Sequence, residues 1–136
     1  MLDRLSHNEQ KALMELLIYM AQSDGKIRDV ENEVLHQYAT LVEVDFRTLE
    51  GNYTPEELIP QFESPASLVV VMQELLRLSH IDGHFNNDEK AAILDIAAHM
   101  GMSLDFVDRI DAWVQEGLRW VLKGEELLEE AEQTLD

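Results

Sequence analysis

The chain has 136 residues, a length that fits one domain with a sizeable core, and 46% of its residues are hydrophobic. Its 28 acidic and 10 basic residues give a formal net charge of −18. This charge argues against nucleic acid or an anionic membrane surface as a partner, because both would be repelled. No cysteine is present, so disulfides, thiolate metal sites and cysteine nucleophiles are excluded.

Apolar residues recur at helical spacing through the first half of the chain, and polar capping residues mark the helix starts. We expect a first helix over about residues 7–22 and a second from about residue 29. Asp45 then caps a brief third helix. Residues 52–66 hold all three prolines and form a connector that contains one short helix.

The second half begins in the same manner, with a strongly apolar helix from Pro65 and another helix after Asn86. A longer helix follows Ser103. Gly124 is expected to end this helix, so that residues 125–135 form a last, acidic amphipathic helix. No alternating strand pattern competes with the helical one, and we predict an all-α fold of seven or so helices.

An internal repeat organises the chain, because Asp-Gly-x-apolar-x-x-x-Glu occurs at residues 24–31 and again at 82–89, 58 positions later (82 − 24). We expect a single domain over residues 1–136, with a first repeat at 10–52 and a second at 67–110, joined by the connector. The C-terminal helices occupy 103–135. Each repeat is a helix-turn-helix-loop-helix unit, and the two are predicted to pack about a pseudo-twofold axis.

The repeated motif matches the second half of an EF-hand calcium loop, with an acidic residue, glycine, an apolar residue and glutamate in the right order. The leading oxygen ligands are missing from both copies, so a working EF-hand is not expected. The motif is explained structurally if Asp-Gly makes the turn and the glutamate caps the next helix. The other interpretation is a site for Mg²⁺, Ca²⁺ or Mn²⁺ in which the two turns pool four carboxylates, those of Asp24, Glu31, Asp82 and Glu89.

The doubled motif, read as [Ala/Ser]-x-x-Asp-Gly-x-apolar-x-x-x-Glu at residues 21–31 and 79–89 and followed by Met-Gly-Met-Ser at 100–103, resembles the TerB-like domains. These domains occur in tellurite-resistance proteins and at the N-termini of some membrane-tethered DnaJ-like co-chaperones. The resemblance covers about residues 10–122. It implies an all-α domain of two pseudosymmetric halves, with a metal-binding or stress-associated role for Asp24, Glu31, Asp82 and Glu89. Arg28 departs from the family pattern, which tends to place a small capping residue there.

Other candidate sites lie outside the four carboxylates. His80 and His84 flank Asp82 and are secondary metal candidates, although we favour a solvated pair of turn histidines because Gly83 breaks the helix between them. Trp113 and Trp120 lie seven residues apart, which suits either core packing or the anchoring of a partner. No phosphate-binding glycine loop and no nucleophile beside a base is evident, and no signal-peptide core or ~20-residue apolar run is present. We therefore expect a non-catalytic, cytoplasmic binding module without direct membrane insertion. It would bind a divalent cation or, alternatively, act as a protein-interaction adaptor, and a hydrolase built from His80, Asp82 and His84 is the third hypothesis.

Overall fold

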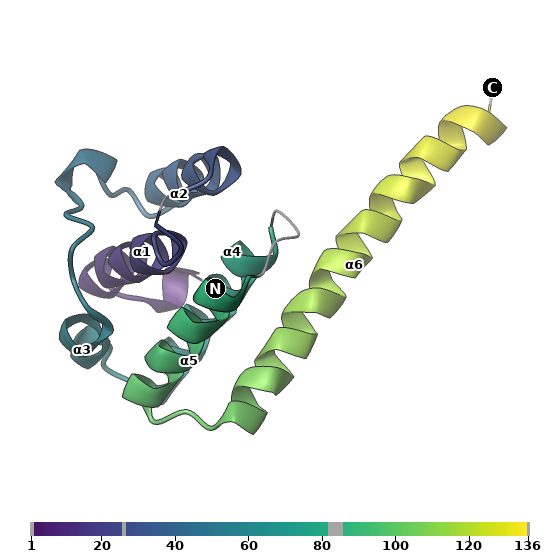
Figure 1. Cartoon of the computed structure of the whole chain (residues 1–136). Coiled ribbons are helices and arrows are strands. Elements are labelled where there is room, and N and C mark those ends of the chain that lie inside the picture. Colours follow the sequence, from purple (N-terminus) through teal and green to yellow (C-terminus); the bar gives the residue numbers. More distant parts are fainter. Residues whose placement is uncertain (1, 26, 82–85, 136) are drawn as a thin grey trace.

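The computed structural model describes residues 2–25, 27–81 and 86–135, and within these ranges it contains helices and connecting segments but no strand. The all-α prediction is thereby confirmed. In chain order the elements are η1 (Leu2–Arg4), α1 (His7–Ala21), α2 (Asp29–Leu41), η2 (Phe46–Thr48), α3 (Pro55–Leu58), η3 (Ile59–Gln61), α4 (Pro65–His80), α5 (Asn87–Met100) and α6 (Leu104–Thr134) (Figure 1). None of the described helices is long and apolar enough to span a membrane.

Side-chain caps set the helix starts, as the capping residues indicate. Ser6 accepts a hydrogen bond from the Glu9 backbone, Asn86 caps α5, and Ser103 caps α6. Elements of the two halves begin in register with the sequence repeat, since α1 and α4, α2 and α5, and η2 and α6 each start 58 positions apart. The brief third helix is a 3-10 turn. A twofold relation between the halves in space stays a prediction.

The expected break at Gly124 is wrong, because α6 continues as one helix of 31 residues. A glycine inside an exposed helix costs only about 1 kcal/mol relative to alanine, which its neighbours can offset. Leu, Glu, Lys and Arg surround both Gly117 and Gly124, and α6 contains no proline that would break the helix. The segment 125–135 is therefore the continuation of α6 and not a separate helix.

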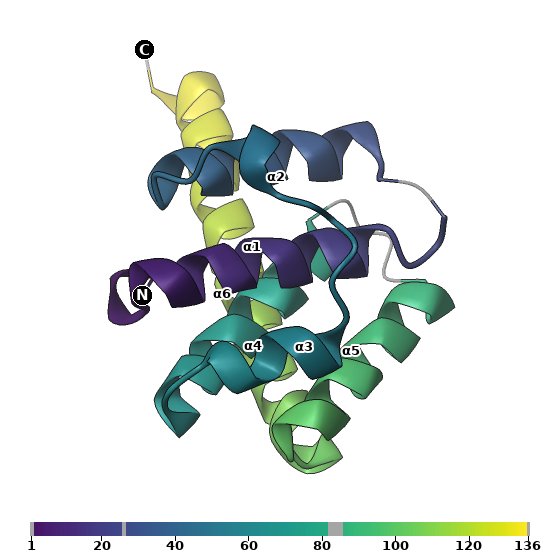
Figure 2. The same cartoon turned by 90° about the vertical axis from the view of Figure 1, so that its left-hand side faces the viewer.

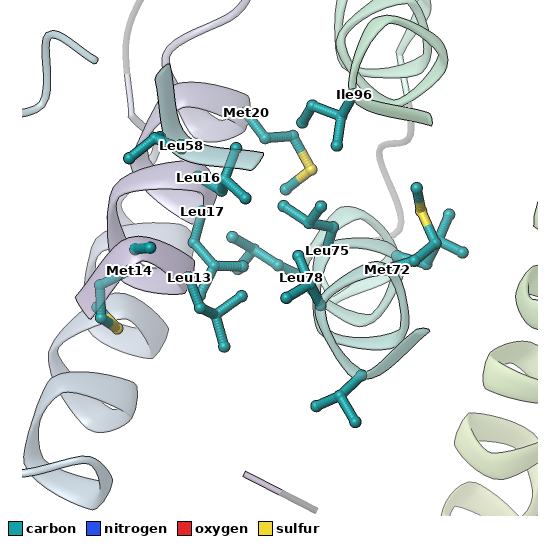
Figure 3. Close-up of a cluster of buried hydrophobic side chains, with 14 of the residues drawn as sticks. Leu13, Met14, Leu16, Leu17, Met20, Leu58, Met72, Leu75, Leu78 and Ile96 are labelled. Carbon is teal, nitrogen blue, oxygen red and sulfur yellow. The ribbon is translucent and has the colours of Figure 1, made fainter. Parts of the chain in front are cut away.

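The core lies mainly between α1 and α4, which pack side by side and are joined by α5 and α3. Figure 3 shows side chains of the two helices pointing toward one another, among them Leu13, Leu17 and Met20 from α1 and Leu75 from α4. Each of these four is fully buried. Burying one such side chain contributes about 1.5–3 kcal/mol, so this layer supplies much of the stability.

The arrangement leaves α6 only partly covered. Figure 2 shows α1 between α2 on one side and α3 and α4 on the other. The first half of α6 packs against α4 and α5 through Val107, Ile110 and Val114, which are buried. The second half extends beyond the bundle (Figure 1). This places the C-terminal half of the longest helix in solvent.

Candidate functional site

The first candidate site is the place where the turn after α1 meets the start of α5, here called the junction and made of Asp24, Arg28, Glu31, Asn86 and Glu89. The guanidinium of Arg28 lies between carboxylates from the two repeats. Its Nη2 is 3.4 Å from Asp24 Oδ2, and its Nη1 is 3.5 Å from Glu89 Oε1. Asp24 and Glu89 thus share one positive charge although they lie far apart in the chain.

Asn86 makes a second link across the junction. Its Nδ2 donates to Asp24 Oδ2 at 3.3 Å and to Glu89 Oε1 at 3.4 Å. Its Oδ1 accepts the backbone N–H of Glu89 at 2.8 Å, as an N-cap residue does. One side chain therefore caps α5 and also joins α5 to the turn after α1.

Glu31 is held at the start of α2, where its Oε1 accepts the backbone N–H of Arg28 at 3.2 Å. Its side chain is only 1% exposed. Arg28 precedes α2 in the position of the cap but has no side-chain acceptor to offer, so only the glutamate half of a capping box is made. Glu31 therefore caps the start of α2 through its contact with the backbone, even though Arg28 stands where a capping residue would be expected.

Arg28 places one positive charge among the carboxylates of the junction. Of the four that were predicted to share a cation, Asp24 and Glu89 meet at Arg28, Glu31 lies at the start of α2, and Asp82 lies outside the described residues. Over residues 2–25, 27–81 and 86–135, no group of three or more His, Asp or Glu side chains is arranged to hold a metal ion. What the structure brings together is an ion-pair network between the two repeats.

His80, a secondary metal candidate, connects helices instead. Its Nε2 lies 2.6 Å from Asp111 Oδ1, which joins the end of α4 to α6. Asp111 also accepts from the side-chain amide of Gln115 at 2.8 Å, one turn further along α6. The other members of that constellation, Asp82 and His84, lie outside the described residues.

The second candidate site is an apolar stripe along α6, in which residues of one kind recur every seven positions. The stripe, here called the α6 stripe, comprises three such rows: Trp113, Trp120 and Leu127; Val114, Val121 and Leu128; and the small residues Gly117, Gly124 and Ala131. Its first members are half-buried or buried against the bundle. Every side chain over residues 119–130 is exposed, with Trp120 at 77% and Leu128 at 70%.

The stripe opens onto a hollow between α4 and α6. A pocket of about 610 Å³ is lined mainly by the stripe, including Trp113, Trp120 and Val121, with Arg77 of α4 at its edge. A second pocket of about 510 Å³ lies between α2 and α4 and also contacts Arg77. Arg77 therefore lines both hollows, one toward α6 and one toward α2, and the two together are here called the groove.

A buried network fixes Arg77 in this groove. Its Nη1 donates to both carboxylate oxygens of Glu74, at 3.0 and 3.1 Å, and the Tyr38 hydroxyl donates to the same carboxylate. Burial raises the pKa of Tyr38 well above its usual range, and the negative charge of Glu74 raises it further. Tyr38 consequently remains a donor at neutral pH, and the charge of Arg77 is balanced within the fold.

Sequence reasoning missed both the ion pair of Arg28 and the groove. The groove depends on the angle at which α6 leaves α4, which no local pattern encodes. The stripe itself had a readable signal, since two tryptophans seven residues apart are followed at the same interval by Leu127. Expecting the helix to end at Gly124 hid the continuity of that row.

Comparisons of the chain with protein-family models, with curated proteins and with solved structures find no match. The TerB-like resemblance therefore stays a prediction that rests on the doubled motif. The junction is closed by contacts within the chain, and the α6 stripe is open.

Proposed function

We propose that this chain is a non-catalytic interaction module that binds a protein partner through the α6 stripe. The observation that carries the proposal is the continuation of one apolar stripe from the bundle into solvent. Val114 is buried against the bundle, whereas Val121 and Leu128, one and two heptads further on, are 50% and 70% exposed. Contiguous apolar surface of this kind marks interaction sites on proteins that are otherwise polar outside.

The composition of the stripe supports the same proposal. Tryptophan is among the residues that contribute most at protein interfaces, because each can bury about 150–250 Å². Both tryptophans of the chain lie on this one stripe, at 46% and 77% exposure. A helical half with few tertiary contacts also gains stability from a partner, since most helical stability in proteins comes from packing an amphipathic face.

The proposal is tested by photocross-linking in the cells that make the protein. A benzoyl-phenylalanine replaces Trp120 in one form of the full chain and Leu104 in the control form. Leu104 is a suitable control because it lies on the same helix and is 59% exposed, but it lies outside the stripe. We expect discrete protein adducts from position 120 and none of the same mass from position 104. Equal adducts from both positions, or none from position 120, would contradict the proposal.

The junction supports a second proposal, the divalent-cation binding that the TerB-like motif implies. In its favour, carboxylates from both repeats converge on one positive charge. A metal would have to displace the guanidinium of Arg28 and recruit Asp82. We expect millimolar Mg²⁺, Ca²⁺ or Mn²⁺ to raise the melting temperature, and the double change Asp24→Asn with Asp82→Asn to abolish the rise. Unaltered melting of the unmodified protein in all three metals counts against this proposal.

A further inference from the structure

We infer that the partner of the α6 stripe is a basic amphipathic helix that lies lengthwise along it, an inference that rests on the proposed function. The seven-residue spacing of the stripe is the spacing with which two helices pack over a long distance. From Trp113 to the end of α6 at Thr134 the helix runs about 32 Å at the α-helical rise, so a matching helix has about 22 residues.

The two glycines of the stripe also point to a helix that comes close. In the described chain, a Cβ placed on Gly117 or Gly124 would meet no neighbouring atom within 4 Å, so the fold itself does not require either glycine. Glycine weakens an exposed helix relative to alanine. A partner backbone packed against this row gains from the missing side chains, because small residues allow two helices to approach closely.

The charges that border the stripe indicate that the partner is positively charged. The residues that border the stripe beyond the bundle are mostly acidic: Glu116, Glu125, Glu130 and Glu132, with Lys123 the one basic residue among them in the printed sequence. A second copy of the chain would place its own glutamates opposite these glutamates. The two molecules would also repel one another, because each has a net charge of −18. A helix with Lys or Arg beside its apolar face instead places opposite charges along both borders.

The groove has room for such a helix where the stripe leaves the bundle. The pocket of about 610 Å³ is apolar along Trp113, Gly117 and Trp120. Arg77 at its edge is bonded to both oxygens of Glu74, so its charge opposes a basic partner less than an uncompensated arginine would. The apolar face of the partner would start in this pocket and continue outward along α6.

The test uses the full chain and a synthetic peptide of about 22 residues, the length of the stripe, with leucines on one helical face and lysines beside them. One control peptide has the same composition in an order that forms no apolar face, and another has glutamate in place of lysine. Trp113 and Trp120 are the two tryptophans of the protein and both lie on the stripe. A blue shift of their emission on titration therefore reports docking directly. We expect saturable binding with a blue shift for the amphipathic basic peptide alone.

Variants separate docking from general attraction of basic peptides to an acidic protein. The double change Gly117→Ala with Gly124→Ala should keep or raise the melting temperature, because alanine favours the helix, while binding weakens about tenfold. The double change Glu125→Lys with Glu132→Lys should weaken binding by a similar factor and reduce its salt dependence. Glu56→Lys, at an exposed position on α3, is the matched control and should leave the affinity within about twofold.

Three results would overturn the inference. The scrambled peptide could bind as well as the amphipathic one, the glutamate peptide could bind equally, or the protein could self-associate with a concentration-dependent blue shift and bind no peptide. In the last case the occupant is a second copy of the chain. If position 120 gives adducts but no peptide binds, the proposed interaction function stands, and only the inference that the partner is a basic helix is wrong. An absence of adducts at that position contradicts the proposed function itself.

Discussion

At the junction, charged side chains from the two repeats face one another inside the fold, whereas along the α6 stripe apolar side chains face solvent. Arg28 and Asn86 connect Asp24 to Glu89, so one carboxylate from each copy of the motif is used in joining the two halves. The stripe belongs to the segment that extends past the second repeat. The contacts of the repeated motif thus join the two halves of the bundle, while the exposed apolar surface proposed as the binding site lies on α6.

The largest expected effect on stability comes from comparing a leucine of the buried layer with a leucine of the α6 stripe, each replaced by alanine. Leu75→Ala removes a fully buried side chain of α4 and should lower the free energy of unfolding by about 3–4 kcal/mol, from lost burial and the cavity left behind. Leu128→Ala removes a side chain that is 70% exposed and should change it by less than about 0.5 kcal/mol. Urea denaturation of both variants measures the contrast. A large loss in Leu128→Ala would mean that the stripe is already covered, and the comparison would fail.

The next effect concerns the junction and compares two arginines. Arg28→Ala should cost about 2–3 kcal/mol, because it leaves Glu89, which is 1% exposed, without its ion pair to Arg28. Arg47→Ala removes a pair with Asp45 whose side chains are 90% and 49% exposed, and should cost less than about 0.5 kcal/mol. Thermal or urea unfolding of the two variants decides the matter. Equal losses would show that the contacts of Arg28 are no more important than a surface ion pair.

A smaller, pH-dependent effect is expected at Glu9, a buried carboxylate that joins α1 to the connector. Its oxygens accept the backbone N–H of Ser6 at 2.9 Å and of Glu63 at 3.0 Å. The Ser6 hydrogen bond is the main cause that lowers the pKa of Glu9, against the opposing effect of burial. Because the folded pKa lies below the ordinary value of 4.5, the ionised carboxylate stabilises the fold above that pH, and the contribution is lost as pH falls through the lowered pKa.

Glu9→Gln should therefore cost about 1–2 kcal/mol at neutral pH, and the gap from the unmodified protein should close as the pH drops below 4.5. The matched control is Glu57→Gln, which changes the same capping role at the exposed start of α3 and should cost about 0.5 kcal/mol. Melting temperatures from pH 7 to pH 3 provide the measurement. A gap that stays constant with pH would mean that ionisation of Glu9 contributes nothing.

Much of the fold could be predicted from short stretches of sequence, because caps and apolar spacing act over a few residues. Ser6, Asn86 and Ser103 predicted the starts of α1, α5 and α6 correctly. Gly124 gave a false stop, since an exposed glycine weakens a helix without ending it. For the candidate site, one interpretation of the sequence grouped Asp24 and Glu89 with two other carboxylates around a cation, and that cation stays a prediction. The bridging role of Arg28 was not predicted, because it requires contact between residues 61 positions apart.

The helical class, the repeat offset and the positions of most helix starts could be read from the chain alone, since they follow from interactions between near neighbours. Tertiary packing, in contrast, sets which of these residues are exposed and which of them contact one another. Packing of Val107, Ile110 and Val114 against the bundle sets the direction of α6 and leaves Trp120 in solvent, although its spacing would equally suit a core. Contact between the turn after α1 and the start of α5 places a guanidinium between carboxylates that had suggested a metal. In both cases the outcome depends on which distant surfaces touch, and local periodicity carries no information about that.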